Sequence, residues 1–335
     1  MPRTAPDPDQ LARRLRAGER AALSQAITLV ESQRPRDRSL ATRLLGSLPP
    51  PTSTFRLGVT GAPGVGKSTF IEAYGAGLLA AGHRLAVLAV DPSSRHTRGS
   101  ILGDKTRMPR LSADRRAFVR PSPAGDTLGG VAHATRQTIA LCEAAGYDRV
   151  LVETVGVGQS EHAVAELVDA MALLVLPGAG DDLQGVKRGI VELADLILVH
   201  KADGDRDRMA RVAAADYRRA VHLQPPRADG WSPRVVTGSS VTDGGLVGFG
   251  ESLTAYAKQL GREGLQTRRR RQHARWFERS WPTRLAELVE EAPGASATLA
   301  HLRAGLAAGT LDVDAATATL LDDLRARLSA DPTPP

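Results

Sequence analysis

At positions 61 to 68 the chain reads Gly61-Ala62-Pro63-Gly64-Val65-Gly66-Lys67-Ser68, and Thr69 follows. An apolar run, Arg56–Thr60, precedes this stretch, and a helical pattern starts near Ser68. A strand, a glycine-rich loop ending in Lys-Ser and a helix, in that order, are typical of a phosphate-binding loop. The alternative, an ordinary glycine-rich turn, does not call for that order. We therefore predict that residues 61–69 bind the phosphates of a nucleotide.

Each part of this loop has a chemical role. Glycines let successive backbone N–H groups turn inward around a β-phosphate, and the helix N-terminus adds partial positive charge. We expect Lys67 to reach the β- and γ-phosphate oxygens and the Ser68 hydroxyl to ligate Mg²⁺. The predicted ligands are therefore a nucleoside phosphate and a magnesium ion.

The middle of the chain alternates short apolar runs with amphipathic helical stretches. We expect strands at Arg56–Thr60, Leu85–Val90, Arg149–Glu153, Ala172–Leu176, Leu196–His200 and Arg234–Thr237. Strands that are apolar along their length and separated by helices indicate a parallel sheet buried between helical layers. The predicted fold class is α/β, a P-loop NTPase fold with a mostly parallel sheet and helices on both faces.

Helical extensions are expected on both sides of this region. Leu and Ala recur at helical spacing in Pro8–Ala17, Arg20–Gln33 and Arg36–Leu48, and again near the C-terminus. The predicted organisation is an N-terminal helical segment at 1–50, a nucleotide-binding domain at 51–262, a C-terminal helical segment at 263–330 and a frayed tail at 331–335.

A second motif, His200-Lys201-Ala202-Asp203, follows an apolar run. It has the position and form of the Asn-Lys-x-Asp motif with which GTPases read guanine, except that His200 replaces the asparagine. The Asp203 carboxylate can accept hydrogen bonds from both N1–H and the exocyclic amine of guanine, a donor pair that adenine lacks. The Lys201 stem can lie along the base. The motif favours guanine, and the alternative is a pair of surface charges at a strand end.

Other candidate residues lie in loops that follow further strands. Ser239-Ser240-Val241 occupies the place where GTPases have a loop whose backbone N–H contacts guanine O6. Asp91 and Asp104 are candidate Mg²⁺ ligands, directly or through water. Glu153 can order water that is bound to Mg²⁺ or that attacks phosphate, and the Gly156 amide can bond the γ-phosphate. For each acidic residue, a solvated carboxylate at a strand end is the alternative.

Together these motifs resemble the methylmalonyl-CoA mutase-associated GTPase family, which includes the MeaB and ArgK-like proteins. The matching strings are Gly61–Thr69, Asp91–Ser94, Gly99–Met108, Arg120–Pro123, Leu128–Ala132, Glu153–Glu161 and Gly180–Lys187. The resemblance covers nearly the whole chain, and His200 is its clear departure. The last string looks like an additional loop of the family. It makes Lys187 a candidate catalytic residue beside Lys67 and Glu153.

The resemblance implies a function and partners. It implies a GTP-hydrolysing chaperone for an adenosylcobalamin-dependent acyl-CoA mutase, which gates cofactor loading and protects or reactivates the mutase. It also implies a homodimer whose interface lies in the C-terminal helical segment. No glutamine stands where Ras-type GTPases place their water-orienting residue, so we predict slow turnover of GTP to GDP until a partner orders Glu153 or Lys187. One alternative is a nucleotide-bound scaffold in which the change to His200 has abolished nucleotide-dependent switching. Another is a small-molecule kinase, for which the motifs supply no base to activate a phosphate acceptor.

The charge balance raises nucleic acid as a further partner. Among 335 residues, 44 Lys and Arg stand against 37 Asp and Glu, which gives a net charge of +7. Arg268–Arg271, with Trp276 and Trp281, has the residue types that contact phosphates and stack on bases. Their Leu-rich helical surroundings favour a dimer arm instead. We therefore expect no nucleic-acid partner.

The remaining composition indicates the compartment. Cys142 is the single cysteine, so a disulfide framework is excluded, and its apolar helical surroundings predict a core position. The eight histidines show no metal-ligand spacing, which argues against nickel-insertion GTPases. Asp7 and Asp9 stand where a signal peptide would be apolar, and no apolar stretch approaches the roughly 20 residues of a membrane span. We expect a cytoplasmic protein without a membrane partner.

Overall fold

The computed structural model describes residues 7–32, 34–49, 54–90, 108–120, 128–154, 160–178, 188–225, 227–242, 244–292 and 294–330. These residues form one parallel sheet of seven strands in the order β3-β2-β4-β1-β5-β6-β7. The strands are β1 (Phe55–Gly61), β2 (Leu85–Val90), β3 (Ala117–Arg120), β4 (Arg149–Thr154), β5 (Ala170–Val175), β6 (Leu196–Val199) and β7 (Arg234–Thr237). The predicted α/β fold with a parallel sheet is confirmed.

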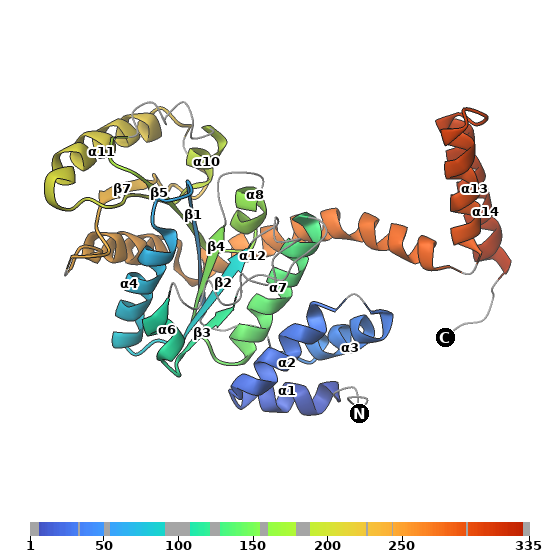
Figure 1. The fold of residues 1–335 in the computed structure, drawn as a ribbon, viewed down its shortest axis with the longest axis horizontal. Coiled ribbons are helices and arrows are strands. Elements are labelled where there is room, and N and C mark those ends of the chain that lie inside the picture. Colours follow the sequence, from blue (N-terminus) through green and yellow to red (C-terminus); the bar gives the residue numbers. More distant parts are fainter. Residues whose placement is uncertain are drawn as a thin grey trace. The chain divides into compact units, whose positions relative to one another are not determined.

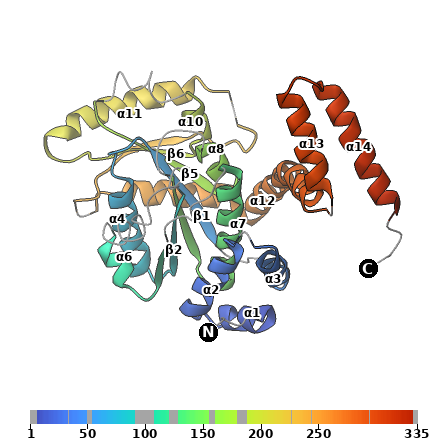
Figure 2. The ribbon, with the colours of Figure 1, turned by 45° about the vertical axis from the view of Figure 1, so that its right-hand side comes forward.

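Helices cover both faces of this sheet (Figure 1 and Figure 2). The described helices are α1 (Pro8–Arg16), α2 (Arg20–Val30), α3 (Pro35–Gly46), α4 (Lys67–Ala80), α6 (Pro109–Ala113), α7 (Leu128–Ala144), α8 (Ser160–Ala165), α10 (Arg188–Leu193), the 3₁₀ turn η1 (Gly204–Arg206), α11 (Asp207–His222), α12 (Val247–Glu291), α13 (Ala295–Ala307) and α14 (Val313–Ala330), and not all of them lie on the sheet. On one face, α4, α6 and the first turns of α12 pack through Phe70, Leu111 and Tyr256. On the other face, α10 and α11 pack through Ile190 and Tyr217.

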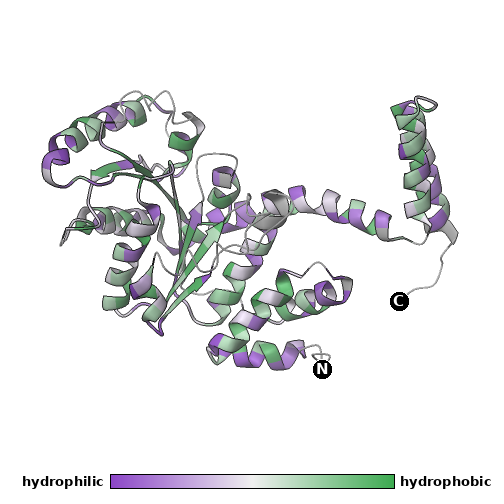
Figure 3. Cartoon of the chain, in the orientation of Figure 1, coloured by the Kyte–Doolittle hydropathy of each residue, from purple (hydrophilic) through white to green (hydrophobic). Residues whose placement is uncertain are grey.

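Alternation along β1 explains how one strand serves two helical layers. Leu57 and Val59 belong to the core on the α4 side. Gly58 faces the other layer, where an added Cβ would lie 2.5 Å from the Sδ of Met171. Only glycine leaves room for this close packing. The central strands are hydrophobic along most of their length (Figure 3), as expected of strands buried on both faces.

The strand β3 was not anticipated from the sequence. Its apolar stretch is short, Ala117–Val119, and the strand pairs with β2 alone at the edge of the sheet. Its extended conformation therefore depends on a neighbour that is distant in sequence rather than on its own pattern. The strands that were anticipated are all present, with ends shifted by up to two residues.

The N-terminal helices α1, α2 and α3 form a small cluster that packs against α7 (Figure 1 and Figure 2). The described residues fall into two compact units, divided between Arg269 and Arg270, inside α12. In the second unit α13 and α14 pack against each other. The expected boundaries at 50/51 and 262/263 stay predictions. None of the described helices combines the length and apolar composition needed to cross a lipid bilayer.

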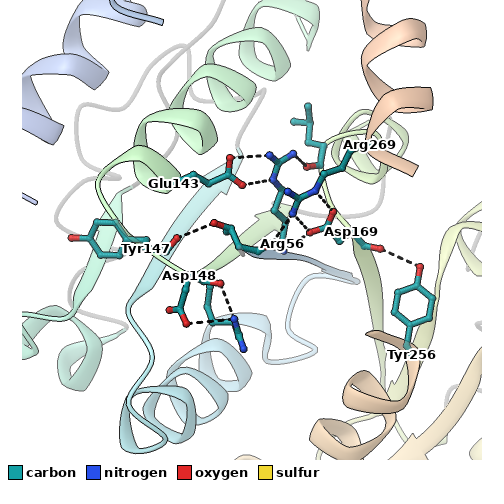
Figure 4. A network of polar contacts seen from close by, with 10 residues as sticks. Arg56, Glu143, Tyr147, Asp148, Asp169, Tyr256 and Arg269 are labelled. Atoms are coloured by element: carbon teal, nitrogen blue, oxygen red, sulfur yellow. Dashed lines mark hydrogen bonds and ion pairs between the residues drawn. The ribbon is translucent and has the colours of Figure 1, made fainter. Parts of the chain in front are cut away.

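A buried network of charges fixes the amino edge of the sheet, where β5 begins (Figure 4). Asp169 is fully buried immediately before β5, and its carboxylate accepts from the backbone N–H of Arg56 at 2.9 Å and from Arg269 Nε at 2.7 Å. Arg56 in turn donates to Glu143 of α7 at 2.7 and 2.9 Å. The hydroxyl of Tyr256 in α12 donates to the Asp169 carbonyl at 3.1 Å. One carboxylate thus connects β1, β5 and α12.

Asp195 repeats this arrangement in front of β6. It is also fully buried, and it accepts from Arg227 at 2.6 Å and from Arg268 at 3.1 Å. Arg268 and Arg269 open the basic run of the sequence, so this half of the run forms ion pairs within the first unit. Cys142 is fully buried in α7, as predicted.

Candidate functional site

The loop after β1 has the geometry that its glycines allow. Gly64 and Gly66 have φ of 80° and 98°, in the left-handed region that other residues rarely adopt. α4 begins at Lys67 directly after the loop, so the helix N-terminus faces it. Lys67 Nζ donates to the carbonyls of Gly61 at 2.8 Å and Ala62 at 3.3 Å. The ammonium group is therefore held over the loop, where the sequence placed a phosphate-binding lysine.

The surroundings of Lys67 have opposing effects on the pKa of its ammonium group. Its side chain is nearly buried, and this burial lowers the pKa of the ammonium group. The carboxylates of Glu153 and Glu161 act on the pKa of Lys67 in the opposite direction. The lysine is thus close to two acidic side chains, one from β4 and one from α8. Its ammonium group can also interact with an anionic ligand.

Ser68 and Glu153 form the part of the predicted metal site that the structure describes. The Ser68 hydroxyl donates to Glu153 Oε1 at 3.2 Å. They meet because β4 is the parallel neighbour of β1, with Glu153 opposite Val59. A hydroxyl and a carboxylate are hard oxygen donors, so the pair fits Mg²⁺. The other predicted metal ligands, Asp91 and Asp104, lie outside the described residues, as do Gly156 and Lys187.

A pair of threonines lies beside the Ser68–Glu153 pair, and the sequence did not predict it. Thr154 Oγ1 donates to Thr60 Oγ1 at 2.9 Å, and both residues are fully buried at the carboxyl ends of β4 and β1. This bond ties together the ends from which the phosphate loop and the Glu153 carboxylate emerge. Thr60 directly precedes the glycine-rich loop in the sequence, but nothing in the sequence indicated that its partner is Thr154.

The second motif lies directly beside the phosphate loop. β6 ends at Val199, and the His200 ring then contacts the carbonyl of Val65 through Nδ1 at 2.8 Å. Lys201 Nζ donates to the carbonyl of Gly64 at 2.9 Å. Lys201 has a φ of 58°, the only left-handed value among the described non-glycine residues, and such strain is frequently found at binding sites. The two motifs therefore form one site.

Asp203 and the loop at 239–241 complete the site. The Ser239 hydroxyl donates to Asp203 Oδ1 at 2.7 Å, which fixes the carboxylate expected to read guanine. Ser240 Oγ lies 2.6 Å from His200 Nε2. The Val241 side chain is exposed, and its backbone N–H donates to Ser239 Oγ at 3.3 Å. The structure thus brings together all the predicted base-site residues.

The fold and these loops define a P-loop nucleotide-binding protein. The family model described as "Methylmalonyl Co-A mutase-associated GTPase MeaB" matches residues 23–294. A putative GTPase of Caulobacter vibrioides is 48% identical over 317 residues, which cover 94% of this chain and 97% of that protein. The mitochondrial methylmalonic aciduria type A homolog of Mus musculus is 47% identical over 281 residues, 80% of this chain and 68% of that protein.

A solved structure supports the same assignment. A protein described as "LAO/AO transport system kinase" is 36% identical, with a TM-score of 0.71, and the match covers 95% of this chain and 97% of that one. The chain belongs to the family of methylmalonyl-CoA mutase-associated GTPases. Membership makes guanine nucleotide the ligand class of the protein and GTP hydrolysis its reaction class.

Proposed function

We propose that the chain binds GTP with Mg²⁺, hydrolyses it slowly, and acts as a chaperone of an adenosylcobalamin-dependent acyl-CoA mutase of the methylmalonyl-CoA mutase type. The observation that carries the nucleotide part is the junction of the two motifs, in which His200 and Lys201 bond to successive carbonyls of the phosphate loop. A guanine base held by Asp203 would thereby have its phosphates directed into residues 61–69. Family membership supports the mutase as the partner.

The proposed reaction is the attack of water on the γ-phosphorus, which breaks the bond to the bridging β–γ oxygen and releases GDP and phosphate. Lys67 would stabilise the charge that develops on the β- and γ-oxygens, and Glu153 would order water near the γ-phosphate. Ser68 and Glu153, with Asp91 and Asp104, would hold Mg²⁺, which when bound would neutralise phosphate charge. Gly156 and Lys187 are proposed γ-phosphate and catalytic contacts.

Exchange of Asp203 for Asn tests the assignment of the base. Because Asn presents a donor to guanine N1–H and its amine, we expect Asp203→Asn to weaken GDP binding about 100-fold. The same variant should gain affinity for xanthosine diphosphate. Asp205→Asn, an exposed change two residues along, is the matched control and should bind GDP normally. Unchanged GDP binding by Asp203→Asn contradicts the proposal.

Phosphate release tests the chaperone proposal. GTP turnover would be measured for the chain alone and with a purified acyl-CoA mutase, with Lys67→Ala as the inactive control. We expect slow release alone and acceleration by the mutase. The reason is that the family resemblance places the switch loops at 91–104 and 153–161 and an additional loop at 180–187. Equal rates with and without the mutase would contradict a partner-stimulated switch and favour the scaffold.

The homodimer is proposed from the apolar surface of α12. Phe277, Trp281, Leu285 and Leu288 are each at least 46% exposed and recur at helical spacing in the second unit. We expect Trp281→Glu to yield monomers by light scattering, whereas Val212→Glu, an exposed apolar position on α11, should leave the mass unchanged. A monomeric wild-type chain contradicts the proposed dimer.

A small-molecule kinase is the second candidate, because the solved relative is described as a transport system kinase. Transfer of labelled γ-phosphate to an acceptor other than water would support it. The proposed compartment is the cytoplasm, and the single buried thiol of Cys142 suits a reducing environment.

A further inference from the structure

His200 contacts both sides of the base site. Its side chain is 2% exposed, with Nδ1 at 2.8 Å from the Val65 carbonyl and Nε2 at 2.6 Å from Ser240 Oγ. The ring also packs against the loop backbone, because a Cβ added to Gly66 would lie 2.9 Å from it. The imidazole therefore occupies a closely fitted place between two loops that are separated by more than a hundred residues of sequence.

These contacts determine which nitrogen carries the proton. The Val65 carbonyl can only accept a hydrogen bond, so Nδ1 must be the donor. In the neutral ring Nε2 then has a lone pair, and it accepts from the Ser240 hydroxyl. A side-chain amide at position 200 would offer the same combination, with its NH₂ donating and its oxygen accepting. His200 therefore preserves the pattern of one donor and one acceptor that the replaced asparagine would supply.

We propose that neutral His200, protonated at Nδ1, is a positioning residue that joins the phosphate loop to the 239–241 loop, and that its protonation weakens guanine-nucleotide binding. This inference rests on the proposed nucleotide function. Protonation places a second proton on Nε2, which can no longer accept from Ser240. The Ser240 hydroxyl must then reverse, and a charge is added to a closed space between the two loops.

The groups around the ring favour its neutral form. Burial lowers the pKa of His200 below its ordinary value, and the Lys201 ammonium lowers it further. The bond to the Val65 carbonyl and the Asp203 carboxylate oppose this shift of the pKa. Phe70 of α4 lies nearly perpendicular to the imidazole, with 6.3 Å between the ring centroids, and adds no charge beside it. The neutral state that the geometry requires is thus the state expected at pH 7.

The first test is the pH profile of GDP affinity for the full chain with Mg²⁺. On lowering the pH from 8 toward 5, wild-type affinity should fall relative to that of His200→Asn, because Asn offers one donor and one acceptor and does not titrate. His222→Asn, a histidine exposed at the end of α11, is the matched control and should follow the wild type. A constant ratio between wild type and His200→Asn, or a wild type that gains affinity in acid, overturns the proposal.

The second test is the dependence of GDP binding on the Ser240 hydroxyl in two backgrounds. At pH 7.5, Ser240→Ala should weaken GDP binding about fivefold in the wild type, because it leaves Nε2 without a donor. We expect His200→Asn to retain the sensitivity to Ser240→Ala, because the amide oxygen is also an acceptor. If Ser240→Ala has no effect in either background, the bridge does not position the loop.

Nitrogen-15 NMR of the imidazole separates this inference from the proposed function. Spectra of the nucleotide-free chain at pH 7.5 should show His200 protonated at Nδ1 and unprotonated at Nε2. The opposite tautomer overturns the inference even if GDP binds. An absence of GDP binding at every pH, with the expected tautomer present, would instead refute the nucleotide function.

Discussion

The two edges of the sheet handle charge in opposite ways. At the amino edge, Asp169 and Asp195 are fully buried and each is paired with arginine guanidinium groups. At the carboxyl edge, Lys67 and Lys201 donate instead to neutral backbone carbonyls of the phosphate loop. A buried carboxylate that is paired with arginine is neutralised within the protein, so its interactions serve the native structure. A lysine that donates only to neutral carbonyls has a positive charge that can still attract an anionic ligand.

This difference separates stability from function within one sheet. The arginines at the amino edge come from β1, α12 and the loop before β7, so they hold distant parts of the first unit together. The carboxyl edge has a left-handed lysine and a short loop with two left-handed glycines. Backbone strain and charged groups that are not neutralised by an ion pair are typical of binding sites. Substitutions at the two edges should therefore have different consequences.

The largest effect on folding is expected for Asp169→Asn. Loss of the carboxylate charge leaves Arg269 buried without its counter-ion, and we expect the free energy of unfolding to fall by about 3–5 kcal/mol. Denaturant unfolding would measure this loss. Glu19→Gln, which breaks the exposed pair with Arg14, is the matched control and should cost about 0.5 kcal/mol or less. The native fraction of Asp169→Asn should bind GDP as the wild type does.

The opposite outcome is expected for Lys67→Ala. Removal of the ammonium should reduce phosphate release from GTP about 100- to 1,000-fold, about 2.7–4 kcal/mol in the barrier, because the developing phosphate charge loses its partner. The free energy of unfolding should change by only about 1 kcal/mol, since Lys67 bonds to neutral carbonyls. A stability loss as large as that of Asp169→Asn would remove the contrast between the two edges.

Smaller effects on stability and on GDP binding are expected at Lys201, whose backbone is strained and whose side chain contacts the phosphate loop. Lys201→Gly and Lys201→Ala both remove the contact to Gly64, so both should weaken GDP binding to a similar extent. Only glycine relieves the φ of 58°, and the Gly variant should be about 1 kcal/mol more stable than the Ala variant. Parallel thermal and binding measurements provide the check. Equal stabilities would show that the left-handed backbone stores no strain.

The sequence was most informative where the residues themselves make the local structure. The phosphate loop at 61–69 and the motif at 200–203 were identified because their spacing encodes backbone conformation and chemistry together. Apolar runs likewise predicted the buried strands. β3 was not predicted, because it contains one β-branched residue, Val119, whereas β7, an edge strand of the same length, contains three.

The contacts that organise the two edges could not be read from the sequence. The bond between His200 and Val65 joins residues 135 positions apart, and that between Arg269 and Asp169 spans 100. The sequence revealed His200 as a departure but gave no indication that its imidazole makes two hydrogen bonds. Arg268 and Arg269 were interpreted as part of a dimer arm, because charge in a sequence does not indicate which side chains are buried.

Calorimetric titration of GDP and of ADP into the purified wild-type chain with Mg²⁺ tests whether the junction of the phosphate loop with residues 200–203 forms a guanine-specific switch site. We expect tight binding of GDP and negligible binding of ADP, because only guanine offers the donor pair that Asp203 accepts. Equal affinity for the two nucleotides, or binding of neither, would contradict a guanine-specific site.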